Sequence, residues 1–157
     1  MIIHTKRDEF ATHIIEKIKK LSFEDFLPKE KVIARKIIVF EKENNYNFRK
    51  QSLEKLKEDI HTFDKINFPE FRTTYYDDQL ALIIESEFIE GKHIKKDDPA
   101  TNIILNEIVN RKSDWTFASF SYHNFILDKK NQLYYIDIDD YKVVPHSKRT
   151  SEFKRFY

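Results

Sequence analysis

The stretch Ser119–Asp140, SFSYHNFILDKKNQLYYIDIDD, contains two short apolar runs separated by the polar residues 129–131. β-Branched and aromatic runs on either side of such a polar turn are typical of an antiparallel hairpin. Asn124 opens the first apolar run, and Asp137 interrupts the second. We expect the hairpin to bring their side chains together, where an amide oxygen and a carboxylate suit a magnesium ion that carries a nucleotide phosphate.

Outside this hairpin, the chain alternates between helical and strand patterns. Apolar residues recur every three or four positions in Gln51–Ile66, which predicts an amphipathic helix. The β-branched run Lys31–Phe40 predicts a strand, and Asp98 followed by Pro99 is typical of a helix start. The expected fold class is α+β, with helices packed on a small antiparallel sheet. The expected elements are helices over Asp8–Leu21, Gln51–Ile66 and Asp98–Lys112, and strands over Lys31–Phe40, Phe71–Tyr76, Gln79–Phe88, Ser119–Asp128 and Leu133–Asp139.

Composition narrows the possible functions. The 157 residues fit one domain over 1–157, and a net charge of +1 gives no overall field for binding nucleic acid. The absence of cysteine excludes disulfides and thiolate sites, and it agrees with a cytoplasmic protein. The longest apolar run, Leu80–Ile84, is far too short for a membrane span, and we expect no signal peptide. Gly91 is the single glycine, so no glycine-rich phosphate loop of standard form is present.

Three more segments carry recognisable patterns in a consistent order. VIARK ends at Lys36 on a predicted strand, LIIESEFIEG ends at Gly91, and SFSYHN ends at Asn124, thirteen residues before Asp137. With these residues, the chain resembles the protein-kinase-like superfamily over about 31–142. The segment that ends at Asn124 is similar to the D-x-S-x-x-N form of Rio-type kinases, with Ser121 and Asn124 kept.

The resemblance implies a compact, truncated kinase-like fold that uses ATP and Mg²⁺ as cofactors. It implies that Lys36 holds the α- and β-phosphates, with Glu54 or Glu58 as its ion partner. Spacing does not choose between these two glutamates, and ordinary pairing with neighbouring lysines on the helix surface is an equal alternative for either one. The implied adenine contacts are backbone groups of Glu87, Phe88 and Ile89. The implied metal ligands are Asn124, Asp137 and Asp139.

Three departures from the family bear on catalysis. The position five residues before Asn124, where kinases carry the aspartate that accepts the substrate proton, is Ser119. No glycine precedes Lys36, and twenty residues after Asp137 leave no space for a peptide-docking subdomain. We therefore expect a minimal phosphotransferase with an unassigned acceptor, with Asp137 as a catalytic residue and Asp114 or Asp139 as a substitute base. The alternative is an inactive pseudokinase that binds a protein partner.

Charge distribution supports a protein partner as well as a nucleotide. Asp77–Asp98 carries seven acidic residues and three lysines, while Lys142–Tyr157 carries five basic residues and one glutamate. Opposed patches of this kind dock within a chain or recruit a partner. A third possibility is a two-metal nuclease, because Asp140-Tyr-Lys142 follows a strand, with Asp128 or Asp114 as the upstream acid. We expect the basic C-terminal tail to be a solvated extension and not a nucleic-acid site.

Overall fold

The computed structural model describes residues 2–7, 11–24 and 27–157, which form two compact units. Unit 1 contains the residues up to Lys50 together with Pro69–Phe88, and unit 2 contains Gln51–Phe68 together with Ile89–Tyr157. Both units combine strands with helices, and most strand pairs are antiparallel. The α+β prediction is therefore confirmed, while a single domain over 1–157 stays a prediction.

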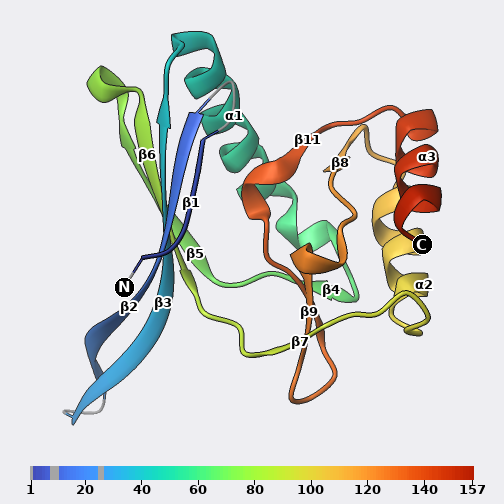
Figure 1. The fold of residues 1–157 in the computed structure, drawn as a ribbon, viewed down its shortest axis with the longest axis horizontal. Coiled ribbons are helices and arrows are strands. Elements are labelled where there is room, and N and C mark those ends of the chain that lie inside the picture. The colour runs from blue at the N-terminus through green and yellow to red at the C-terminus, as the bar shows by residue number, and fades with distance from the viewer. Residues whose placement is uncertain (1, 8–10, 25–26) are drawn as a thin grey trace. The chain divides into compact units, whose positions relative to one another are not determined.

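Unit 1 is built on one five-stranded antiparallel sheet (Figure 1). Its strand order is β1-β2-β3-β6-β5, and the chain runs through helix α1 (Glu43–Asp59) between β3 and β5. The predicted hairpin of Phe71–Tyr76 with the following strand is confirmed, and its turn ends at Leu80, which has a φ of 49°. The strands are β1 (Ile2–Arg7), β2 (Ala11–Glu24), β3 (Leu27–Phe40), β5 (Phe71–Tyr76) and β6 (Ala81–Glu87).

The helix expected over Asp8–Leu21 is wrong. Residues 11–21 belong to β2, and residues 8–10 lie outside the described residues. β2 pairs with β3 along its whole length, from Ala11 opposite Phe40 to Glu24 opposite Leu27. The apolar spacing of this segment fits a helix, but it also contains the β-branched residues that strands favour. Hydrogen bonding to the long strand β3 favours a strand over a helix for this segment. The sequence of the segment alone gives no information about this partner strand.

One face of the unit 1 sheet carries Lys36. Side chains alternate along β3, so Lys36 shares a face with the buried Ile38 and Phe40. The start of α1 packs on this face, because the Tyr46 ring meets the Phe40 ring edge-on at 6.0 Å. Lys36 itself is half-buried and engaged with its surroundings. The sheet therefore places this lysine on its helix-covered side and not on its open side.

Helix α1 (Glu43–Asp59) begins earlier than expected. The sequence predicts a helix from Gln51, because Asn44 and Asn45 have a turn-like composition. In the structure these asparagines form the first turn of α1, next to the favourably placed acidic Glu43. The buried Tyr46 anchors that turn by donating a hydrogen bond from its hydroxyl to Asp77 Oδ1 at 2.5 Å. A contact 31 residues away thus extends the helix by two turns.

The contact between Tyr46 and Asp77 predicts an acid-dependent loss of stability. The hydrogen bond from Tyr46, and to a smaller extent that from Lys50 at 3.1 Å, lowers the pKa of Asp77 from its ordinary value. A lowered carboxyl pKa stabilises the fold above the ordinary pKa, and this contribution is lost as the pH falls. We expect Tyr46→Phe to lower the melting temperature at pH 7, with the gap to wild type closing below about pH 4. Phe48→Leu, at an exposed helix position, is the control; an equal gap at pH 7 and pH 3 would contradict this interpretation.

Unit 2 contains a four-stranded sheet in the order β4-β10-β9-β7 and a separate two-stranded ladder of β8 with β11. All pairs are antiparallel except β4 with β10. The predicted hairpin before and after 129–131 is confirmed, with strands shorter than expected. The strands are β4 (Ile66–Asn67), β7 (Gly91–His93), β8 (Trp115–Phe117), β9 (Phe125–Asp128), β10 (Leu133–Tyr135) and β11 (Tyr141–Val143).

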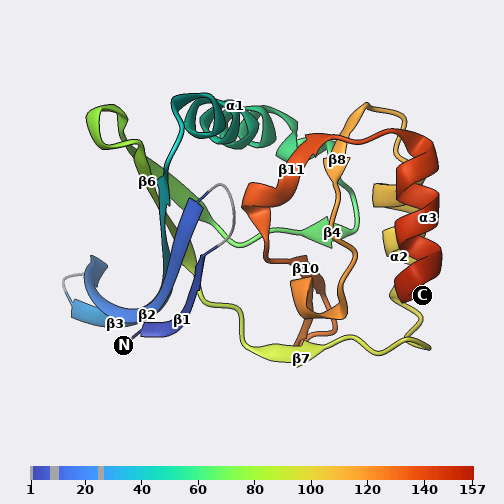
Figure 2. The same ribbon diagram turned by 45° about the horizontal axis from the view of Figure 1, so that its top comes forward.

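The helix expected over Asp98–Lys112 is present in unit 2 over a shorter range. Asp98 caps the expected start, since its Oδ1 accepts a hydrogen bond from the Ala100 N–H at 2.9 Å. Helix α2 (Thr101–Ile104) then continues as a π-helix over Leu105–Val109. Helix α3 (His146–Phe156) packs against this π-helical turn, as Figure 2 shows for the yellow and red helices. Within the described ranges, no helix is both long and apolar enough to cross a bilayer.

Gly91 permits a close approach of two strands in unit 2. β7 pairs with β9 so that Gly91 lies opposite Asp128. A Cβ atom at Gly91 would lie 2.1 Å from the Leu127 carbonyl oxygen and 2.7 Å from the Ile126 side chain. Backbone cannot move away as a flexible side chain does, so only glycine fits. The single glycine is therefore explained by strand packing.

Aromatic rings form the centre of unit 2. The fully buried Phe117 contacts the Tyr135 ring at 4.1 Å and the Tyr141 ring at 5.0 Å. Phe125 adds an edge-on contact with Tyr135 at 5.0 Å. These rings come from β8, β9, β10 and β11, so they hold the hairpin and the two-stranded ladder together. The hairpin that carries Asn124 and Asp137 therefore rests on a rigid aromatic core.

Candidate functional site

Asn124 and Asp137 lie next to the same end of the hairpin β9–β10. A short 3₁₀ helix over Tyr122–Asn124 leads into β9, and its first turn is capped by Ser121. The backbone N–H of Ile136 donates a hydrogen bond to the Asn124 carbonyl oxygen at 2.9 Å. This bond continues the strand register by one position and joins Asn124 to the residue directly before Asp137. The structure thus places Asn124 beside the segment that leads to Asp137, while joint metal binding by the two residues stays a prediction.

The Asn124 side chain is fixed by Ser119. Its Nδ2 donates a hydrogen bond to Ser119 Oγ at 2.8 Å, so its carbonyl oxygen Oδ1 remains as the acceptor. Ser119 is the position where the family carries an aspartate. The serine therefore has a structural contact of its own with the predicted metal ligand.

Three aspartates cluster after β10. Asp137 precedes a 3₁₀ turn over Ile138–Asp140, which is closed by a hydrogen bond from the Asp140 N–H to the Asp137 carbonyl oxygen at 3.0 Å. Burial raises the pKa of the Tyr135 hydroxyl well above its ordinary value, and the charges of Asp140, Asp137 and Asp139 raise it further. The charges of all three carboxylates thus act on one buried hydroxyl, which Asp140 alone is seen to contact.

Asp140 binds the loop that carries Ser119. Its Oδ2 accepts hydrogen bonds from the N–H groups of Ala118 at 2.8 Å and Ser119 at 2.6 Å, and from the Tyr135 hydroxyl at 3.1 Å. Burial raises the pKa of Asp140, and the nearby Asp139 raises it further, while the Ser119 N–H and Lys142 oppose the shift. A half-buried carboxylate with three donors on one oxygen works as a structural clamp.

The predicted metal ligands share this region of unit 2. Asn124 and Asp137 are half-buried, whereas Asp139 is buried, and both aspartates are engaged with other groups. In the part of the chain that the structure describes, no group of three or more His, Cys, Asp or Glu residues is arranged as a metal cage. Magnesium in nucleotide sites is typically held by one or two protein oxygens together with phosphates and water, and the donor set fits that mode.

The predicted nucleotide contacts lie partly in unit 1. Lys36 belongs to unit 1, whereas Glu54 and Glu58 belong to the part of α1 in unit 2. Glu54 pairs with Lys57 at 2.8 Å and Glu58 with Lys55 at 3.9 Å, and both glutamates are exposed. This is the helix-surface pairing that the sequence left open. Convergence of Lys36 with either glutamate stays a prediction.

The segment Glu87–Ile89 was expected to offer unpaired backbone groups to adenine. Two of its N–H groups are already used, since Glu87 donates to the Glu70 carbonyl at 2.9 Å and Phe88 to the Val32 carbonyl at 3.3 Å. The expectation of unpaired donors is wrong at these two residues. Hydrogen bonding to β3 thus extends one residue beyond the end of β6 at Glu87. An adenine contact at Glu87, Phe88 or Ile89 stays a prediction that needs other backbone groups.

Asp114 lies beside Arg149 of α3. Its carbonyl oxygen accepts hydrogen bonds from the Val144 N–H at 3.0 Å and from Arg149 Nη2 at 3.2 Å, while its side chain is exposed. Its role as a substitute base stays a prediction. Two of the acidic residues that the nuclease alternative requires have structural contacts instead. Asp128 Oδ1 accepts hydrogen bonds from N–H groups of the hairpin turn, and Asp140 Oδ2 accepts one from the Ser119 N–H.

The sequence missed the buried Arg149. The tail was expected to be a solvated extension, but it forms α3, and Arg149 is only 3 % exposed. Its guanidinium donates to the carbonyl oxygens of Arg111, Ser113, Asp114 and Val144 at 2.6 to 3.2 Å. Burial lowers the pKa of Arg149. The sequence of a basic segment does not indicate which of its lysine or arginine side chains is buried in the fold.

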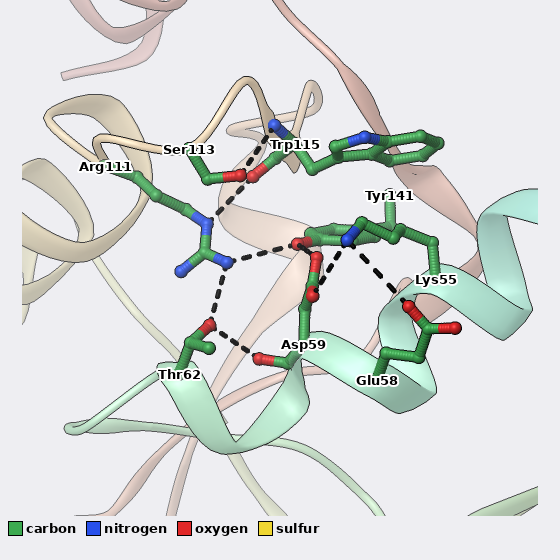
Figure 3. A network of polar contacts seen from close by, with 8 residues as sticks. All are labelled: Lys55, Glu58, Asp59, Thr62, Arg111, Ser113, Trp115 and Tyr141. Carbon is green, nitrogen blue, oxygen red and sulfur yellow. Dashed lines mark hydrogen bonds and ion pairs between the residues drawn. The ribbon is translucent and has the colours of Figure 1, made fainter.

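A second polar network joins distant parts of unit 2 (Figure 3). Arg111 donates from Nη2 to Thr62 Oγ1 at 2.8 Å and contacts the Tyr141 hydroxyl at 3.2 Å. The Tyr141 hydroxyl donates to Asp59 Oδ2 at 2.7 Å, and Lys55 pairs with Asp59 at 3.2 Å. Each of these groups has a protein partner, which indicates a brace for the fold and not a ligand site.

Comparison with known proteins adds no family to this picture. Neither a protein-family model nor a curated protein matches the sequence.

Proposed function

We propose that the chain is a minimal kinase-like protein that binds a nucleotide with Mg²⁺ and transfers its terminal phosphoryl group to an acceptor hydroxyl. The observation that carries this proposal is the backbone hydrogen bond from Ile136 to Asn124, which holds Asn124 beside the residue directly before Asp137 at one end of the hairpin. In protein kinases, the catalytic-loop Asn and the metal-binding Asp hold the ions. Asn124 and Asp137 match these two residues in order and in type.

The order of elements in unit 1 supports the same proposal. Kinases carry the phosphate-binding lysine on the third strand and its glutamate on the following helix. Lys36 lies on β3, the third strand of unit 1, and α1 follows directly. Lys36 also shares the sheet face on which Tyr46 of α1 packs. This arrangement supports the proposal that the lysine holds the α- and β-phosphates.

The chemistry asked of these residues is modest. In phosphoryl transfer, the acceptor oxygen bonds to the γ-phosphorus, the bond to the β–γ bridging oxygen breaks, and the acceptor proton leaves to a base or to water. When bound, Mg²⁺ supplies neutralisation of the phosphate charges. Asn124 and Asp137 offer the oxygens that hold it, and rigid placement on the hairpin keeps them in position.

A binding module without turnover is the second candidate. Ser119 cannot act as a base near neutral pH, and its Oγ is occupied by Asn124. Glu54 and Glu58 are paired on the helix surface. A protein with these features would hold a nucleotide or a protein partner without transferring phosphate.

Calorimetric titration with ATP, with and without Mg²⁺, tests the proposed function. We expect binding that requires Mg²⁺ and that weakens at least about tenfold in Asn124→Ala, the loss typical of a metal-site residue. Asn102→Ala, an exposed asparagine in the same unit, should bind like wild type. Binding without ATP turnover would favour the binding module. No heat with millimolar nucleotide would refute both nucleotide proposals.

A further inference from the structure

A closed ring of hydrogen bonds surrounds Asn124. Asp140 Oδ2 accepts from the Ser119 N–H at 2.6 Å, and Ser119 Oγ accepts from Asn124 Nδ2 at 2.8 Å. The backbone carbonyl oxygen of Asn124 accepts a hydrogen bond from the N–H of Ile136 at 2.9 Å, and Ile136 directly follows Tyr135 in the chain. The Tyr135 hydroxyl closes the ring, at 3.1 Å from Asp140 Oδ2 and 3.3 Å from the Ser119 carbonyl oxygen.

Within the ring, the Asn124 side chain turns its nitrogen toward Ser119. A primary amide has one accepting oxygen and one donating nitrogen, and rotation by half a turn exchanges them. In the structure the bond to Ser119 Oγ uses the nitrogen, which leaves Oδ1 available as a ligand. Without this bond, either end of the amide is free to turn toward a cation. Only the oxygen end can hold Mg²⁺.

Asp140 in turn fixes Ser119. Two consecutive N–H groups of Ala118 and Ser119 point at one carboxylate oxygen, which sets the backbone direction of the loop. Charge-assisted bonds of this kind are stronger than neutral ones. The buried Phe120, directly after Ser119, adds an apolar anchor. The position of Ser119 Oγ is therefore determined by Asp140 and the core, and not by solvent.

We infer that Ser119 and Asp140 are positioning residues that act in series to hold Asn124 Oδ1 as a magnesium ligand. The inference rests on the proposed function for the role of the metal. It assigns a task to the serine that stands where kinases carry their aspartate: Ser119 serves metal binding in place of proton transfer. Asp140 belongs to neither the proposed nucleotide contacts nor the proposed metal ligands. It contributes to metal binding through its hydrogen bond to Ser119.

The test compares Ser119→Ala with Ser119→Thr and with Ser121→Ala. Ser121 is the matched control, because it lies in the same loop and its hydroxyl bonds to the His123 N–H instead of Asn124. Calorimetry at several Mg²⁺ concentrations gives the affinity for ATP with and without the metal. We expect Ser119→Ala to weaken Mg²⁺-dependent binding about tenfold, to leave metal-free binding unchanged, and to be rescued by threonine. An equal loss in Ser121→Ala, or no loss in Ser119→Ala, would overturn the inference.

Hydrogen exchange separates this inference from the proposed function. In Asp140→Asn the amide oxygen can still accept from Ala118 and Ser119, whereas Asp140→Ala removes the acceptor. We expect the Ala118 and Ser119 N–H groups and the Asn124 side-chain NH₂ to exchange faster in Asp140→Ala only. This result together with no ATP binding by wild type would refute the proposed function while the ring stands. Unchanged exchange in Asp140→Ala, judged on the folded fraction, would refute the ring itself.

Discussion

Asp137→Ala is expected to reduce Mg²⁺-dependent ATP turnover about a thousandfold, equivalent to about 4 kcal/mol of transition-state stabilisation. Asp137 is the carboxylate among the proposed ligands that is not buried, so its removal leaves the metal with the neutral Asn124 oxygen and the buried Asp139. Asp137→Asn keeps the shape and one oxygen and should lose less. Turnover measured as phosphate release, with nucleotide affinity measured separately, distinguishes loss of chemistry from loss of binding.

The matched control for this prediction is Asp97→Ala. Asp97 is an exposed aspartate in the same unit, and its replacement should change turnover less than twofold. If Asp137→Ala left turnover unchanged, the activity would belong to another site or to a contaminant. If Asp97→Ala and Asp137→Ala lost activity equally, general charge and not metal binding would explain the effect.

Ser119→Asp is expected to raise turnover about a hundredfold, the usual contribution of a general base. The aspartate would stand five residues before Asn124, where kinases carry the group that accepts the substrate proton. Its carboxylate could still accept the hydrogen bond from Asn124 Nδ2, so the metal ligand would keep its orientation. The gain should appear in kcat and leave the affinity for Mg²⁺-ATP nearly constant.

Ser119→Asn is the control for size. It adds the same bulk without a base, and it should show no gain in turnover. The aspartate also brings a new charge close to Asp140, whose pKa is already raised by burial, so Ser119→Asp should lower the melting temperature. A variant that is folded, binds Mg²⁺-ATP and gains no turnover would favour the binding module over the phosphotransferase.

Local pattern was sufficient for the elements whose partners are close in sequence. The strands before and after 129–131 and the pair Phe71–Tyr76 with Ala81–Glu87 are hairpins with polar turns, and both formed as expected. In the first hairpin, Asp128 Oδ1 binds the Lys130 and Gln132 N–H groups, which explains why this turn is readable from sequence. The meeting of Asn124 with the Asp137 segment follows from this hairpin.

Distant partners explain the errors. β2 has apolar spacing that fits a helix, and only its pairing with β3 makes it a strand. α1 begins at Glu43 because Tyr46 reaches Asp77, 31 residues away. Arg149 is buried by four carbonyl oxygens from two other segments. The local sequence around each of these residues does not indicate the distant contact that it makes.

Only some residues of the candidate site could be predicted from the sequence. Asn124 and Asp137 were identified from residue type and order. The link from Asp140 through Ser119 to Asn124 was missed, because Ser119 looked like the loss of a catalytic group and Asp140 like one more acid after a strand. The signal was present in part, because Asp140 closely follows the buried Tyr135, and an Asp near the end of a strand can accept hydrogen bonds from backbone N–H groups.

Binding of Mn²⁺ with ATP, followed by NMR, tests the central claim most directly. Mn²⁺ replaces Mg²⁺ at oxygen sites and broadens the signals of nuclei close to it. We predict that substoichiometric Mn²⁺-ATP first broadens the Asn124 side-chain NH₂ signal and the backbone amides of Asp137 and Ile138, and that Asp137→Ala abolishes this selective broadening. Selective broadening elsewhere in the chain, or none at all at saturating Mn²⁺-ATP, would contradict the account.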